Sequence, residues 1–170
     1  MNRSGIFVGI YFVLYVLVQV MLFKQLVLFN TAFCFLYIAF ILLLPLETNT
    51  LILMLVGFLL GICVDVFYDS LGLHALSLVL VAYLRNYWLG TVTPQGGYDA
   101  GEGLTLSANG LQWFMVYSVP LVFIHHFVLF FAEAGGFGIF WFTMQKVMTS
   151  LIFTMVAILF LQYFSVDRRR

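Results

Sequence analysis

Six long apolar stretches, separated by short polar segments, follow one another along the chain. An α-helix needs about 20 predominantly apolar residues to cross the hydrocarbon core of a bilayer. The stretches cover residues 5–23, 26–46, 51–67, 74–89, 111–132 and 139–164. This pattern predicts an all-α integral membrane protein with six transmembrane helices in a single domain over residues 1–170.

The third and fourth stretches are the shortest. Residues 74–89 would form a helix of about 24 Å at ~1.5 Å per residue, so this pair barely crosses the bilayer. Two alternatives stay open for the pair: the two segments dip in and out around a buried connection, or they merge to leave five spans. The main loop is predicted at residues 90–110, where glycine is frequent.

The composition agrees with lipid as the solvent. Hydrophobic residues make up 64% of the chain, charged residues make up 8%, and the mean hydropathy is +1.12. Soluble domains average about 25% charged residues, so a soluble enzyme is excluded. The formal net charge is zero, and no basic patch is large enough to bind nucleic acid.

The positions of lysine and arginine predict the orientation. In a six-span layout one side of the membrane collects Arg3, Arg85 and residues 168–170, whereas the other side collects Lys24 and Lys146. Cytoplasmic loops carry the excess of positive residues. We therefore expect both termini in the cytoplasm.

Ionisable residues at membrane depth are costly, and in this layout they gather in the outer half. They are Asp65, Asp69, His74, His125, His126, Glu133 and Lys146. Four interpretations are open: solvated helix ends, an internal polar network, a site for a partner's membrane segment, and metal or haem ligation by histidine. We expect one of the aspartates to pair with Lys146 or with a basic residue of a partner.

Small residues mark two further candidate contacts. Gly57 and Gly61 form a Gly-x-x-x-Gly pair in the third stretch, and Gly5 and Gly9 repeat this spacing in the first. Such pairs let helix backbones approach closely in a membrane. The contact is either intramolecular or made with a partner helix.

The chain shows no motif of a reaction centre. It has no phosphate-binding loop, no Gly-x-Ser-x-Gly and no His-Glu-x-x-His. The prediction is therefore a non-catalytic protein without a cofactor or metal. An intramembrane enzyme would need paired catalytic groups that face each other.

Four segments carry a resemblance to a known family. They are GFLLGICVDVFYDSLGLHAL at residues 57–76, which includes Gly72 and continues into VAYLR at 81–85, TPQGGYD at 93–99, LTLSANGLQWF at 104–114 and HHFVLFFAE at 125–133. Together they resemble the MreD family of multi-pass rod-shape-determining proteins, in its Bacteroidota-type branch. The length and six-span layout are similar over nearly the whole chain.

The resemblance implies a fold, a place and a role. MreD-like proteins sit in the bacterial inner membrane with MreC, which has a single membrane span. They help couple MreB filaments to the RodA glycosyltransferase and a class B penicillin-binding protein, and so support cell shape and lateral peptidoglycan synthesis. Their fold is similar to substrate-binding subunits of energy-coupling-factor transporters. The alternative function is a small-solute binding or transport subunit, whose outward polar cluster would line a cavity.

Overall fold

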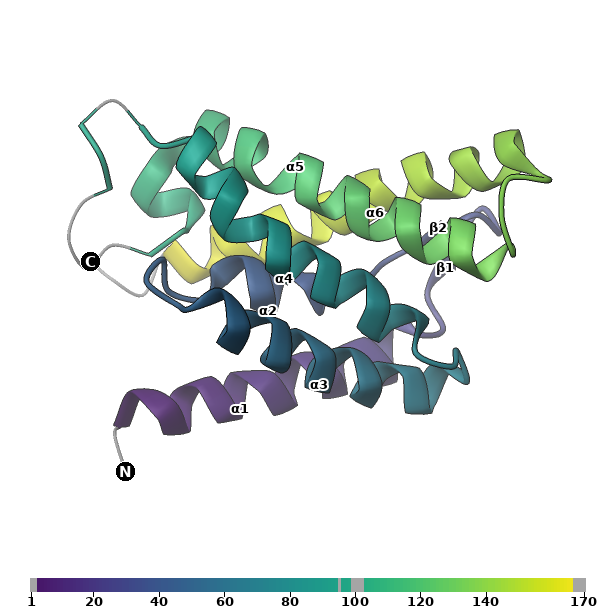
Figure 1. Ribbon diagram of the computed structural model, residues 1–170, viewed down its shortest axis with the longest axis horizontal. Helices are drawn as coiled ribbons and strands as arrows, with labels where there is room; N and C mark the ends of the chain where they lie inside the picture. The colour runs from purple at the N-terminus through teal and green to yellow at the C-terminus, as the bar shows by residue number, and fades with distance from the viewer. Residues whose placement is uncertain (1–2, 95, 99–102, 167–170) are drawn as a thin grey trace.

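The computed structural model describes residues 3–94, 96–98 and 103–166. The described part is a helical bundle with one small β-hairpin (Figure 1). Its elements are α1 Arg3–Val18, a π-helical turn η1 Gln19–Phe23, β1 Val27–Leu28, β2 Ala32–Phe33, α2 Ile38–Leu43, α3 Thr50–Tyr68, α4 Leu73–Thr91, α5 Leu106–Glu133 and α6 Phe140–Val166.

Within the described residues, four helical segments are long and apolar enough to cross a membrane. They are Gly5–Phe23, Thr50–Tyr68, Leu106–Glu133 and Phe140–Phe164. The predicted class, an all-α multi-pass membrane protein, is confirmed at this level. Helix α4 is as long as α3, at 19 residues each, but it carries Arg85 and Asn86 within its length and does not join the four.

The predicted helix over residues 26–46 is wrong. The chain forms the antiparallel β1–β2 hairpin, continues without helix to Tyr37, and is α-helical only over Ile38–Leu43. The turn at Phe29 and Asn30 holds left-handed φ angles of 51° and 60°, which a helix does not allow, and Pro45 follows soon after α2. An apolar run alone cannot distinguish a lipid-facing helix from buried extended chain.

This segment forms the centre of the molecule. All residues from Cys34 to Leu42 are buried, and Tyr37, Ile38 and Ala39 are fully inaccessible. In Figure 1, α2 lies behind α4 in the middle of the bundle, and it contacts α1, α3 and α4. Because neighbouring helices cover it, irregular backbone is tolerated at membrane depth.

The described end of the main loop is partly helical. Helix α5 begins at Leu106, but Gly110 breaks it with φ 79° and ψ 164°. The continuous part therefore starts at Leu111, as the apolar pattern predicts. The helix remains continuous by its φ/ψ angles through Pro120, so the interruption within α5 is caused by glycine.

Candidate functional site

Helix α4 occupies the space beside the glycine pair of α3. A methyl group added to Gly61 would lie 2.3 Å from Ala75 Cα, and one added to Gly57 would lie 3.3 Å from the Leu78 carbonyl oxygen. Both glycines are buried against α4. The pair therefore serves a close intramolecular contact, which was one of the two interpretations left open.

Asp65 links the two helices of this hairpin. Its carboxylate accepts hydrogen bonds from the backbone N–H of His74 (3.0 Å), the backbone N–H of Ala75 (3.0 Å) and the Ser70 hydroxyl (2.5 Å). A carboxylate at a helix N-terminus satisfies orphan N–H groups and favours the helix dipole. Gly72, with φ 90°, occupies the N-cap position and has no side chain to do this. Asp65 on α3 therefore acts as the missing cap of α4.

Lys146 pairs with a different acid from the one that we expected. Its Nζ lies 3.1 Å from Glu133 Oε2 and rests over the rings of Phe33 and Phe130. Asp65 is occupied by the α4 cap, and Asp69 is an exposed left-handed C-cap of α3. Pairing of an aspartate with Lys146 is therefore wrong for this chain, whereas pairing with a basic residue of a partner stays a prediction.

A tyrosine joins two buried histidines at the centre of the bundle. The Tyr37 hydroxyl lies 2.8 Å from His74 Nδ1 and 2.7 Å from His125 Nε2. His125 Nδ1 is buried without a hydrogen-bond partner among the described residues. An unpaired N–H is the costlier orphan, so we assign the proton of His125 to Nε2. It then donates to Tyr37, whose hydroxyl donates to His74 Nδ1.

Gln19 anchors the end of the first helix to this cluster. Its amide nitrogen donates to the Cys34 carbonyl (2.9 Å) and the Tyr68 hydroxyl (2.8 Å), and its amide oxygen accepts from the Tyr37 N–H (3.3 Å). Gln19 is fully buried and opens the π-helical turn. π-Helical turns are uncommon and usually mark a local requirement, which here is the placement of this amide.

Side chains of α6 also accept hydrogen bonds from the backbone N–H groups of the extended segment before α2. The Phe33 N–H donates to Ser150 Oγ at 2.9 Å, and the Phe35 N–H donates to Thr154 Oγ1 at 3.0 Å. His126 Nε2 lies 3.1 Å from the same Thr154 hydroxyl. An unsatisfied backbone group in the membrane interior costs several kcal/mol. The polar residues of α6 therefore pair with a segment that has no helical bonds of its own.

Arg85 performs a related task at the other end of α2. It is fully buried, and its guanidinium donates to the Leu44 and Pro45 carbonyls and, at 3.1 Å, to the Tyr117 hydroxyl. Tyr117 in turn donates to the Leu42 carbonyl at 2.8 Å. A cation is favoured at a helix C-terminus. Arg85, predicted only as a topology signal, is a C-terminal cap for α2.

The polar residues therefore fit the interpretation of an internal network. Within the described ranges, no group of three or more metal-binding side chains lies close enough to hold an ion. No motif in the sequence points to Gln19, Tyr37 or Thr154 as site residues. Each of the three is a polar residue inside an apolar stretch, and this could have marked it as a candidate. Nothing in the pattern indicates which of these polar side chains lie close together in the fold.

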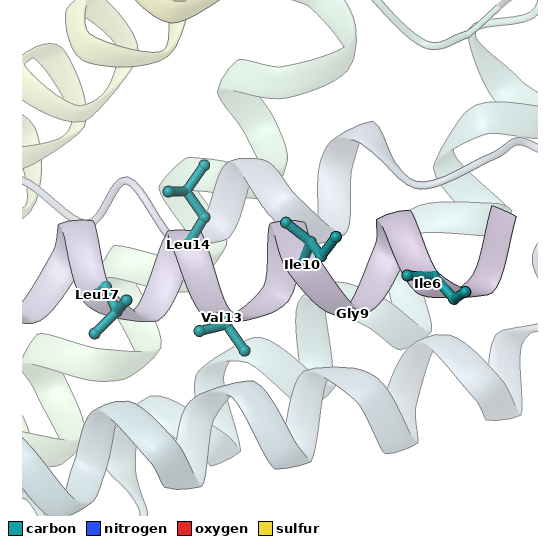
Figure 2. A pocket seen from close by; sticks show the side chains of 6 residues that line it. All are labelled: Ile6, Gly9, Ile10, Val13, Leu14 and Leu17. Atoms are coloured by element: carbon teal, nitrogen blue, oxygen red, sulfur yellow. The ribbon is translucent and has the colours of Figure 1, made fainter. Parts of the chain in front are cut away.

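The outer face of α1 presents the opposite situation. Gly5 and Gly9 have no atom within 4 Å of an added methyl group. Gly9 is one of the residues that line a shallow, open groove on the outside of the helix (Figure 2). The groove is about 490 Å³ in volume and is lined by Ile6, Gly9, Ile10, Val13, Leu14 and Leu17. Only 11% of this first span is buried, against 33–56% for the other three.

A second pocket lies at the C-terminal end of α4. It is about 300 Å³ in volume and is lined by Leu46, Asn86, Leu89, Gly90, Thr93 and Tyr98. The Tyr98 hydroxyl donates to the Leu89 carbonyl at 3.1 Å, and partial burial raises the pKa of this phenol. Neither pocket is lined by a histidine of the central cluster.

Comparison of the chain with protein-family models, with curated proteins and with solved structures finds no match.

Proposed function

We propose that this protein is a non-catalytic membrane scaffold of the MreD type. In this proposal it lies in the bacterial inner membrane with both termini in the cytoplasm. It binds an MreC-like single-span protein and supports cell shape and lateral peptidoglycan synthesis in a complex with MreB, a RodA-type glycosyltransferase and a class B penicillin-binding protein. The proposal rests on the sequence resemblance together with the surface described above.

The observation that carries the proposal is the contrast between an interior whose polar side chains are mostly paired within the chain and an exposed first helix. The carboxylate of Asp65, the amide of Gln19 and the guanidinium of Arg85 are all held by the chain itself. By contrast, α1 offers a shallow, open groove that is lined in part by Gly9. Helix association in lipid depends on close packing at small residues. Such a surface suits a partner's transmembrane helix better than it suits catalysis.

The first resembling stretch, residues 57–76, covers the end of α3, the turn and the start of α4. Gly61, Asp65 and Gly72 each have a structural role there: close contact, helix cap and left-handed N-cap. In a scaffold these residues hold the shape of the surface that partners bind. We therefore move the proposed partner site from this hairpin to α1.

The alternative, a solute-binding or transport subunit, would use the extended segment before α2, since unwound backbone at membrane depth forms such sites. The N–H groups of Phe33, Phe35 and Tyr37 are already bonded to protein side chains. A solute would have to displace these bonds. The scaffold is therefore the function that the contacts support best.

Affinity purification from a rod-shaped host tests the proposal. The intact protein should co-purify with an MreC-like protein, and its deletion should give round cells. Gly9→Leu, which fills the α1 groove, should reduce co-purification at normal expression. Gly90→Leu is the matched control, because Gly90 also has open space around it but lies on α4. Normal rod shape after deletion would contradict the proposal.

Fusions test the orientation separately. A reporter after Arg170 should be active in the cytoplasm, whereas a reporter inserted near Asp69 should be active in the periplasm. A periplasmic C-terminus would overturn the proposed sidedness and leave the described fold unchanged.

A further inference from the structure

One end of the bundle carries bulky apolar side chains at the tips of its turns. The β1–β2, α3–α4 and α5–α6 turns lie at the same end, at the right of Figure 1 and opposite the start of α1. Their tips are Phe29, Leu71 and Phe137, with exposed fractions of 93%, 101% and 66%. Trp141, in the first turn of α6, is 83% exposed at the same end.

The turn at the opposite end has a different character. The connection from α2 to α3 presents Glu47 and Asn49 to the outside, and Asn49 caps α3 by accepting from the Leu51 N–H at 2.8 Å. Polar tips of this kind are usual for turns in water. Position in a turn therefore does not by itself account for the apolar tips.

The backbone holds two of these tips outward at a cost. Phe29 and Leu71 have left-handed φ angles of 51° and 50°, which bulky residues seldom adopt. Neither side chain folds back onto the bundle. Strain of this kind persists where the surroundings favour the resulting orientation.

The backbone N–H groups of the α3–α4 turn also need few hydrogen bonds from water. The N–H groups at the start of a helix are normally orphans, but those of α4 are paired within the chain. Leu73 donates to the Ser70 carbonyl, His74 and Ala75 donate to the Asp65 carboxylate, and Leu76 donates to the Gly72 carbonyl. A helix start with its N–H groups satisfied internally can lie in a medium that offers few hydrogen bonds.

The α5–α6 turn is closed in the same way. The N–H groups of Ala134 and Gly136 donate to the carbonyls of Phe130 and Phe131 at 2.9 and 3.0 Å. These two bonds satisfy carbonyl groups that a helix C-terminus leaves free. Both helix hairpins thus end in turns whose backbone is bonded to itself.

Helix length places the α3–α4 turn near the lipid boundary. The two helices have 19 residues each, which gives about 28 Å at ~1.5 Å per residue. The hydrocarbon core is about 30 Å thick. A hairpin of this length reaches the far boundary without extending into bulk water.

We propose that this end of the protein is embedded in the interfacial layer of one lipid leaflet, with Phe29, Leu71 and Phe137 inserted among the phospholipids. The partner of this surface is the membrane itself. Trp141 lies at the depth that tryptophan prefers. Lys24 donates to the Phe67 carbonyl and Lys146 pairs with Glu133, so both cations at this end are bonded within the chain. Asp69 extends to the headgroups.

Accessibility of a spin label tests the proposal on the full chain. Cys34 and Cys63 are replaced by alanine, and a nitroxide is attached to Phe29→Cys, Leu71→Cys or Phe137→Cys. Glu47→Cys is the matched control, because it lies in a turn at the opposite end. Each protein is checked by gel filtration and reconstituted into vesicles of phosphatidylethanolamine and phosphatidylglycerol.

Oxygen partitions into lipid, whereas a water-soluble nickel chelate does not. We expect the ratio of oxygen to nickel accessibility to be several-fold higher at the three tips than at Glu47. Ratios at all three tips equal to that at Glu47 would overturn the proposal and would indicate a water-exposed surface, available to another protein. Phe29 and Leu71 are almost fully exposed, so labels at these two positions should not disturb packing. The Phe137 ring also lies against Phe131, with ring centroids 4.9 Å apart, so the gel-filtration profile of labelled Phe137→Cys must match that of the wild type before its ratio is compared.

Discussion

Two glycine pairs with the same spacing have opposite surroundings in this protein. Gly57 and Gly61 on α3 lie against α4, where an added methyl group at Gly61 would overlap the backbone of Ala75. Gly5 and Gly9 on α1 have open space at the same position. The comparison shows that a Gly-x-x-x-Gly pair indicates a face able to form a close contact, and that only the fold tells whether the contact is already formed.

Helices α3 and α1 also differ in how they are attached to the rest of the bundle. Helix α3 is joined to α4 by close backbone contact and by the Asp65 cap. Residues 5–11 of α1 are exposed on every side, and the helix meets the bundle through Phe12, Tyr15 and Gln19. Substitutions that fill space or remove bonds should therefore destabilise the two regions to different extents.

The largest effect should come from Gly61→Leu. Its Cβ alone would lie 2.3 Å from Ala75 Cα and 2.6 Å from Ala75 N, so the helices must separate. Overpacking of this kind costs about 3 kcal/mol or more when backbone has to move. We expect little folded protein in detergent, measured by gel filtration and thermal unfolding. Wild-type stability would show that α3 and α4 are not in close contact.

Asp65→Ala should come next. It removes a carboxylate that accepts from His74, Ala75 and Ser70, and leaves buried donors unpaired at about 1–3 kcal/mol. Thermal unfolding should shift downward by a corresponding amount. Asp69→Asn is the control, since Asp69 is exposed and asparagine also accepts its left-handed φ of 54°, and surface substitutions without such strain usually stay within about 0.5 kcal/mol. Equal shifts for the two would argue against the cap.

Gln19→Leu tests how α1 is held. The variant loses hydrogen bonds to Cys34, Tyr37 and Tyr68, and loss of a buried partner costs about 1–3 kcal/mol. Hydrogen exchange should increase over η1 and the end of α1, and much less over α3. Gln25→Leu serves as control because Gln25 is exposed. Unchanged exchange in Gln19→Leu would show that aromatic packing alone holds α1.

Gly57→Ala should have a small effect. Its added methyl group would lie 3.3 Å from the Leu78 carbonyl oxygen and 3.5 Å from Ala82 Cβ, so α4 has to move by only a few tenths of an ångström. We expect a loss well below that of Gly61→Leu, measured by thermal unfolding in the same detergent. A loss as large as that of Gly61→Leu would mean that the hairpin is equally tight along its length.

Gly9→Leu should change the stability of the isolated protein least. Nothing lies within 4 Å of its added methyl group, so the thermal midpoint in detergent should match that of the wild type. Any effect should appear only as weaker binding of the proposed partner. A destabilised monomer would show that α1 contacts the bundle more closely than described.

Much of the fold could be predicted from the sequence, because its determinants are local. The apolar stretches at residues 51–67, 111–132 and 139–164 coincide with α3, α5 and α6, since each is long enough to satisfy its backbone within one helix. The stretch at 74–89 lies within α4. Low charge and high hydropathy likewise indicated a membrane protein without reference to its fold.

Only the tertiary structure decided the conformation of residues 26–46 and the hydrogen-bond partners of the polar side chains. That stretch is as apolar as its neighbours, but its N–H groups at Phe33, Phe35 and Tyr37 find partners on α6 and η1. Such bonds join residues up to 119 positions apart, and no local pattern encodes them. For the same reason, the sequence could place Asp65 and Lys146 in one half of the membrane but could not say that the first caps α4 while the second pairs with Glu133.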